Sequence, residues 1–189
     1  MKLLTVLKEM NHMNTILWKG LNIRLLVKYL EDNNIGKIYE PTGKYFEEVV
    51  QNILDKLEVL TPQGINLIVN VKDILKYPLK FYDQDSEHPQ MFHKVIGLNS
   101  ISPDANLIWI NEITTKPVTF EDVPKYINLG YTEIVPGGKT MIHNSRYIIR
   151  MDEKNSDKEV DVTVVKHINP DNINTKWVLN KDFEEVGKE

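Results

Sequence analysis

The stretch that decides the predicted fold is YTEIVPGGKTMIHNSRYIIRMDEKNSDKEVDVTVVKHI, residues 131–168. We predict a strand over 131–135, a turn at Pro136-Gly137-Gly138 and a long strand over 139–151. The residues at 152–159 are charged and predict an exposed loop. A further strand is expected over 160–168, so this stretch predicts an antiparallel meander.

The residues before this stretch predict mostly helices, followed by isolated strands. Apolar residues recur near the helical period over 3–17, 23–30 and 45–58, and each of these segments is predicted to be a helix. Short runs of apolar and β-branched residues predict strands over 65–71 and 107–113. A short helix is also expected between Thr119 and Gly130, because Thr119 with Asp122 resembles a capping box.

The order of these elements, helices first and strands later, indicates an α+β fold. We predict N-terminal helices packed against a C-terminal, mainly antiparallel sheet arranged as a meander. The chain is expected to form a single domain over 1–189. It comprises a helical part at 1–60, a mainly β part at 61–168 and a C-terminal interaction tail at 169–189.

Composition excludes several classes of function. The 189 residues carry a net charge of −4, with only three arginines among 23 basic residues, so nucleic acid is not expected as the main partner. Cysteine is absent, which excludes disulfides and thiolate metal sites. No signal peptide or membrane span is predicted. We therefore expect a cytoplasmic protein, or a virion protein if the source is viral.

One segment has a partial likeness to a phosphate-binding loop. Pro136-Gly137-Gly138-Lys139-Thr140 matches the end of Gly-x-x-x-x-Gly-Lys-Ser/Thr. The leading glycine would stand at position 133, where the chain has Glu133, and the residues that follow predict a strand rather than a helix. A hairpin turn explains the two glycines better, and no cofactor is predicted.

The acidic residues and histidines yield only weak candidates for a metal or catalytic site. Asp83, Asp85, His88 and His93 lie close in sequence and are residue types that bind divalent metals, but their spacing matches no ligand motif. We therefore predict no metal site, with these four as weak candidates. His143 and His167 lie on neighbouring predicted strands and could pair, but packing is the favoured role and no catalytic residue is assigned.

Apolar residues surround most of the helix predicted over 21–30, which indicates burial in the core or against a partner. The polar C-terminal segment carries spaced aromatic residues that also favour docking on another surface. The residues predicted to form an interface are Leu21, Leu25, Leu26, Tyr29, Trp177 and Phe183.

These patterns favour a non-catalytic structural or assembly protein that acts through protein–protein contacts. Homo- or hetero-oligomers are expected. The sequence has 20 isoleucines, 18 asparagines and one alanine, a bias that indicates an AT-rich genome and suggests a bacteriophage virion component of the connector or neck type. The alternatives are a small metal-dependent enzyme acting on a phosphate ester or nucleotide, and an acidic regulatory protein that inhibits a host factor.

Overall fold

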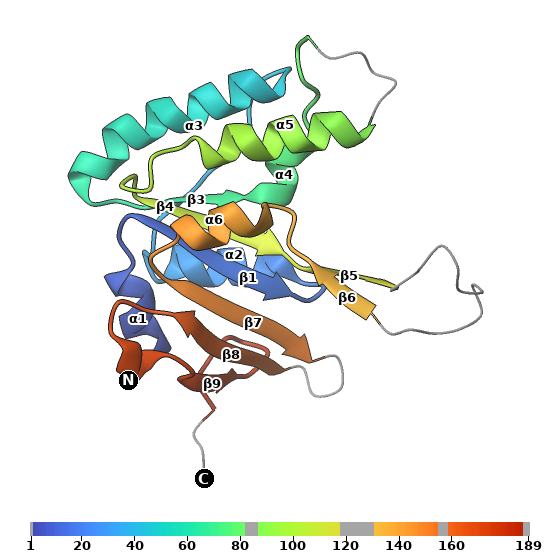
Figure 1. Cartoon of the computed structure of the whole chain (residues 1–189). Coiled ribbons are helices and arrows are strands. Elements are labelled where there is room, and N and C mark those ends of the chain that lie inside the picture. Colours follow the sequence, from blue (N-terminus) through green and yellow to red (C-terminus); the bar gives the residue numbers. More distant parts are fainter. Residues whose placement is uncertain (1, 82–86, 118–130, 155–158, 187–189) are drawn as a thin grey trace.

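A computed structural model of the chain describes residues 2–81, 87–117, 131–154 and 159–186. Its centre is a seven-stranded sheet with the order β2-β3-β4-β1-β7-β8-β9 (Figure 1). These strands are β1 (Met13–Lys19), β2 (Lys37–Ile38), β3 (Leu67–Asn70), β4 (Leu107–Glu112), β7 (Ile148–Lys154), β8 (Glu159–Lys166) and β9 (Lys176–Leu179). The pairs from β2 to β7 are parallel, and β8 and β9 continue the sheet in antiparallel register.

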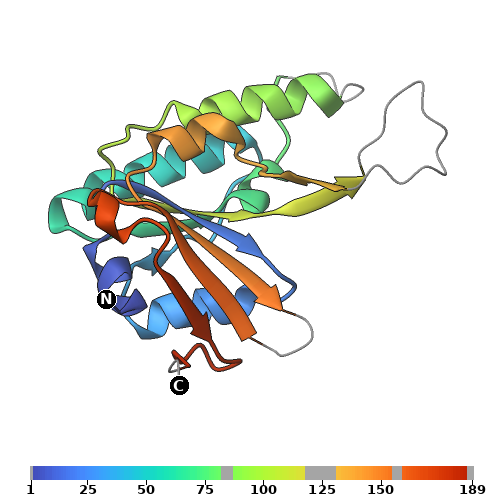
Figure 2. The ribbon, with the colours of Figure 1, turned by 60° about the horizontal axis from the view of Figure 1, so that its bottom comes forward.

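Helices cover both faces of the parallel strands (Figures 1 and 2). They are α1 (Leu3–Glu9), α2 (Ile23–Asp32), α3 (Phe46–Leu60), α4 (Val71–Leu75), α5 (Glu87–Asn99) and α6 (Gly138–Asn144). Strands β5 (Thr114–Pro117) and β6 (Tyr131–Ile134) form a separate antiparallel ribbon that projects from the body of the molecule (Figures 1 and 2).

The predicted fold class, helices packed against an antiparallel meander, is wrong. The largest error concerns residues 3–17, which were predicted to be one helix. The helix α1 ends at Glu9, His12 takes a positive φ of 59°, and β1 begins at Met13. Strand β1 lies between two parallel neighbours under helices on both faces, so residues Met13 to Trp18 are all buried. A strand buried on both faces shows no alternation, and its apolar run resembles a helix.

The second error concerns residues 139–151, which were predicted to be one strand after a hairpin turn. They contain helix α6 and the beginning of β7. Strand β7 is parallel to β1, and parallel strands need a crossover between them rather than a tight turn. Helix α6 lies in that crossover, and the buried Met141 and Ser145 fix it to the sheet.

Other predicted elements are confirmed. Helices α2 and α3 occupy the predicted segments 23–30 and 45–58, and β3, β4 and β8 lie within a few residues of the predicted strands. The turn after α3 is a short 3₁₀ helix that ends at Gly64, with a φ of 70°. The helix predicted over 119–130 lies outside the described residues.

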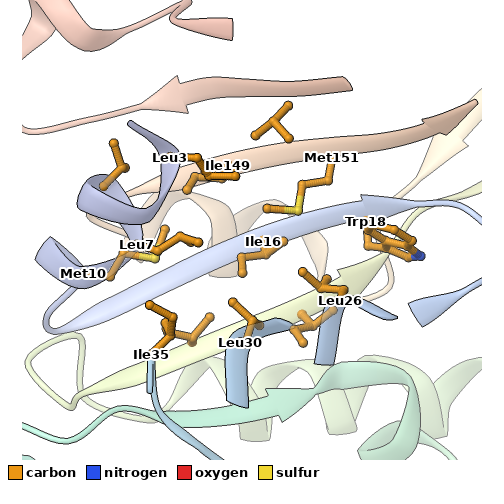
Figure 3. Close-up of a cluster of buried hydrophobic side chains, with 14 of the residues drawn as sticks. Leu3, Leu7, Met10, Ile16, Trp18, Leu26, Leu30, Ile35, Ile149 and Met151 are labelled. Carbon is orange, nitrogen blue, oxygen red and sulfur yellow. The ribbon is translucent and has the colours of Figure 1, made fainter. Parts of the chain in front are cut away.

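Two apolar cores lie on the two faces of the sheet. One core joins α1 and α2 to residues of β1, β4, β7 and β8, and Figure 3 shows its central members, among them Ile16, Trp18 and Leu26. The other core joins α3, α4, α5 and α6 to the opposite face, with Trp109 fully buried at its centre. The two helix layers therefore hold the parallel strands at fixed positions, which fixes the loops at their carboxyl ends.

The C-terminal segment adds β9 to the sheet and then folds back along it. The backbone N–H of Val186 donates to the carbonyl oxygen of Val178 at 2.8 Å. Phe183 is 5% exposed and stacks on Trp18, with ring centroids 6.2 Å apart. No helix within the described ranges is long and apolar enough to cross a membrane.

Candidate ligand crevice at the carboxyl end of the sheet

The candidate site lies where the adjacent parallel strands β1 and β4 end, with Trp18 opposite Glu112. After β1 the chain enters α2, which packs on one face of the sheet. After β4 it runs through β5 and β6 to α6, which packs on the other face. Such a switch between adjacent strands opens a crevice, and open α/β sheets bind ligands there.

A slot of about 660 Å³ opens at this edge, between α2 and the sheet. Its apolar walls include Ile38, Ile68 and Ile110 from three neighbouring strands, with Ile23 and Val27 from α2. Charged residues also line the slot, among them Lys28, Glu31, Glu40 and Asp73. A cavity of several hundred Å³ that combines apolar walls with polar groups is typical of small-molecule sites.

Polar side chains gather at the mouth of this slot. The Nδ2 group of Asn70 donates to Glu112 Oε2 at 3.0 Å, and Asn70 Oδ1 accepts from the backbone N–H of Lys72 at 3.1 Å. Asn70 therefore caps α4 and positions the Glu112 carboxylate at the same time. The Nζ atom of Lys72 lies 3.8 Å from Glu112 Oε1, a long ion pair.

Glu112 lies between two cavities. A second cavity of about 480 Å³ shares Leu21, Lys72 and Glu112 with the slot and extends toward β1 and β5. The Glu112 side chain is 17% exposed, so its carboxylate is largely withdrawn from water but reaches both spaces. Arg24, exposed on α2 at the rim of the slot, makes no ion pair within the described part of the chain.

A network of charges connects β6 to β1 and β7. Arg150 donates to Glu133 of β6 through two hydrogen bonds of 2.8 Å and to Asp152 through bonds of 2.7 and 2.8 Å. Lys19 at the end of β1 also donates to Glu133, at 2.9 Å. The hydrogen bonds from Arg150 and then Lys19 lower the pKa of Glu133 to about 2. The network fixes the β5–β6 ribbon to the sheet.

The connection between β1 and α2 does not form a phosphate-binding loop. It consists of Gly20-Leu21-Asn22, whereas such a loop needs the longer Gly-x-x-x-x-Gly-Lys-Ser/Thr. The segment from Pro136 to Thr140 follows β6 and includes the first three residues of α6, a helix of only seven residues. There the backbone N–H of Gly137 donates to Asn111 Oδ1 at 3.0 Å. The predicted hairpin turn is absent, and this N–H is already satisfied within the protein.

Two of the four weak metal candidates, Asp83 and Asp85, lie outside the described residues. His88 and His93 belong to α5, where the His93 side chain is exposed. Among the described residues, no three His, Asp or Glu side chains are placed to hold a metal ion together.

The two histidines considered as a pair occupy different settings. His143 is exposed in the last turn of α6. His167 is buried directly after β8, and its Nδ1 accepts from the backbone N–H of Asn169 at 2.9 Å. The rings of His167 and Tyr147 pack in a T-shaped arrangement with centroids 4.8 Å apart. These contacts describe a packed histidine.

The six predicted interface residues are divided between the core and the surface. Leu26 is fully buried and Phe183 is 5% exposed, both within the chain's own core. Leu21 is 87% and Leu25 36% exposed, and Tyr29 and Trp177 are half-buried. Helix α2 is thus apolar toward the sheet, with Arg24, Lys28 and Asp32 among its exposed residues.

Comparison with known proteins finds similarity in structure only. No family model matches the sequence, and no curated protein resembles it. The alignment with the RadB recombinase spans 91% of this chain and 78% of the recombinase chain, with a TM-score of 0.42 and 11% sequence identity. The alignment with a KaiC-like protein from Pyrococcus horikoshii OT3 spans 90% of this chain and 74% of that protein, with a TM-score of 0.45 and 12% sequence identity. The alignment with another P. horikoshii OT3 protein spans 90% of this chain and 92% of that protein, with a TM-score of 0.42 and 7% sequence identity.

The predicted role as a structural component of a phage virion is wrong. The chain forms a helix-covered, mostly parallel sheet, and not N-terminal helices packed against an antiparallel meander. The helix that motivated the prediction buries its apolar side in its own core. The residues of the crevice were missed because Asn70 and Glu112 gain meaning only once β3 and β4 are known to be parallel neighbours.

Proposed function

We propose that this chain binds an amphipathic small molecule in the slot between α2 and the sheet. The observation that supports the proposal is the placement of Glu112, a largely buried carboxylate at the mouth of an apolar slot of about 660 Å³. The apolar body of the ligand would pack on Ile38, Ile68 and Ile110. Its polar end would donate a hydrogen bond to Glu112.

The charged side chains at the mouth of the slot restrict which chemical groups the polar end of the ligand can carry. Glu112 accepts hydrogen bonds, whereas Lys72 and Arg24 only donate them. A group that offers both a donor and an acceptor, such as an amide or an amino acid end, satisfies all three. Removing the carboxylate charge by Glu112→Gln should weaken binding of such a ligand by about fivefold, because hydrogen bonds to charged groups are stronger by about 1 kcal/mol.

The test uses three sets of aromatic fragments that end in an amide, an amine or a carboxylate. Binding is followed by NMR at the backbone amides of Ile38, Ile68 and Ile110. Val27→Trp should narrow the slot and weaken binding, because Val27 lines it from α2. Val165→Trp, at a site on β8 that is 44% exposed, is the matched control and should bind as the wild type does. Unchanged binding by Val27→Trp, or no binding by any set, would refute the proposal.

A protein partner is a second proposal, supported by a different surface. Helix α5 exposes Phe92 at 64% and Ile96 at 50%, one turn apart on the same side of the helix. We propose that this surface joins two copies of the chain. Sedimentation should show self-association that Phe92→Ser abolishes and Val186→Ser, at an exposed site in the C-terminal segment, does not. A strict monomer at micromolar concentration would refute it.

A further inference from the structure

A carboxylate from a distant part of the chain bonds to the two residues directly before α2. Oε2 of Glu153, near the end of β7, accepts from the backbone N–H of Leu21 at 2.7 Å and of Asn22 at 3.1 Å. These residues are separated by 132 and 131 positions in sequence. The side chain of Asn22 itself makes no capping bond, so Glu153 is the acceptor at this end of the helix.

The position of this carboxylate is the one where a phosphate binds in many α/β proteins. The first turn of a helix presents unpaired N–H groups and the positive end of the helix dipole. When that helix follows a central parallel strand at a switch point, phosphate groups of ligands bind there. Here a carboxylate of the protein already lies at the turn between β1 and α2, where it accepts from the N–H groups of the two residues directly before the helix.

The loop is shaped around this carboxylate. A Cβ atom added to Gly20 would collide with Oε2 of Glu153 and would lie 2.5 Å from its Cβ atom. Only glycine permits the loop after β1 to pass this close to β7. The absence of a side chain at Gly20 is therefore what leaves room for the side chain of Glu153, although the two residues are distant in sequence.

We propose that Glu153 is a specificity-determining residue that replaces ligand phosphate at this crevice. The internal carboxylate excludes nucleotides and other phosphate-bearing molecules from the N-terminus of α2. This deepens the proposed function, because it removes phosphorylated compounds from the amphipathic molecules that the slot binds.

The test is an NMR titration with inorganic pyrophosphate at constant ionic strength, followed at the amides of Leu21 and Asn22. Wild-type protein should show no saturable shift up to about 20 mM, a concentration that fills a millimolar site. Glu153→Ala should bind pyrophosphate with an affinity raised by about tenfold or more, because the freed N–H groups then face an anion. Asp161→Ala, which removes a carboxylate of β8 that pairs with Lys154, is the control and should behave as wild type.

Glu153→Gln guards against a loss of folding in the alanine variant. It keeps an acceptor for the same N–H groups and removes only the charge, so it should bind pyrophosphate more weakly than Glu153→Ala but more tightly than the wild type. Binding by the wild type as tight as that of the variants would overturn the proposal. So would two folded variants that bind no pyrophosphate. The fragment titration reads the isoleucine amides of the slot, so failure of one proposal is distinguishable from failure of the other.

Discussion

The parallel and antiparallel parts of the sheet are built in different ways. In β1 and β4 nearly every residue is buried, because helices cover both faces. In β8 burial alternates, with Val160, Val162 and Val164 inside and Val165 exposed on the other face. The parallel part carries the crevice at its carboxyl end. Its last strand, β7, supplies Arg150 and Glu153, which bond to the neighbouring ribbon and loop. The antiparallel strands β8 and β9 continue the sheet from β7.

The largest effect should come from removing a core residue of the parallel part. Trp109 on β4 is fully buried among α3, α4 and α6, so Trp109→Ala should lower the free energy of unfolding by about 3–5 kcal/mol. Trp177→Ala on the edge strand β9 makes the same chemical change at a half-buried site and should cost clearly less. Urea denaturation measures both. Equal losses would show that the two parts are packed alike.

A smaller effect should separate the two faces of the antiparallel part. Val162 is fully buried against the α1–α2 core, so Val162→Ala should destabilise the protein by about 2 kcal/mol, from two lost methylene equivalents and a small cavity. Val165→Ala on the open face should change stability by less than about 0.5 kcal/mol. Thermal unfolding of the pair measures the difference. A large loss for Val165→Ala would indicate that this face is covered.

The difference between strands buried on one face and strands buried on both faces explains how much of the fold the sequence predicts. Strand β8 is predicted from 160–168 because one buried face leaves an alternating pattern. Strand β1 is missed because burial on both faces removes the alternation, and Ile16, Leu17 and Trp18 then continue an apolar run that begins in α1. Helix α3 is predicted correctly because it has one apolar side. Helix α2 is also predicted at the right place, but it is apolar on one side only and not around most of its circumference.

The crevice depends on information that no local pattern contains. The strands that end at Asn70 and Glu112 are predicted, but their parallel pairing is set by crossovers through whole helices. Glu153 lies in the segment predicted to be a charged loop, and its partners are more than a hundred residues away. Nothing near position 153 distinguishes this carboxylate from one exposed to solvent.

The contact between the two parts can be tested at the loop after β1. Gly20→Ala should destabilise the protein by about 1–3 kcal/mol, because the new methyl group meets Glu153. The loss should be smaller in a Glu153→Ala background, where the obstacle is gone, and a double-mutant cycle measures this coupling. Gly64→Ala is not a suitable control, because its φ of 70° adds backbone strain. A loss independent of residue 153 would indicate that the loop itself is strained.

The smallest effect should come from the ion pairs between the ribbon and β7. Glu133 is 35% exposed, so solvent screens its pairs with Arg150 and Lys19, and Glu133→Gln should cost about 0.2–1 kcal/mol near neutral pH. Its pKa falls from 4.5 to about 2 in the folded state, so the folded protein holds fewer protons than the unfolded chain between these values. The stabilisation is therefore complete above about pH 5 and is lost as the pH falls toward about 2.

The measurement for Glu133 is the difference in unfolding free energy between wild type and Glu133→Gln, taken across that acid range. The difference should shrink as the pH falls and should also decrease with added salt, because the pairs are partly exposed. A difference that stays constant with pH and salt would mean that the ribbon is held by its backbone and apolar contacts. The β5–β6 ribbon would then be fixed by the short connection from β4 to β5 and by apolar contacts such as those of Ile113 and Val135, and not by these charges.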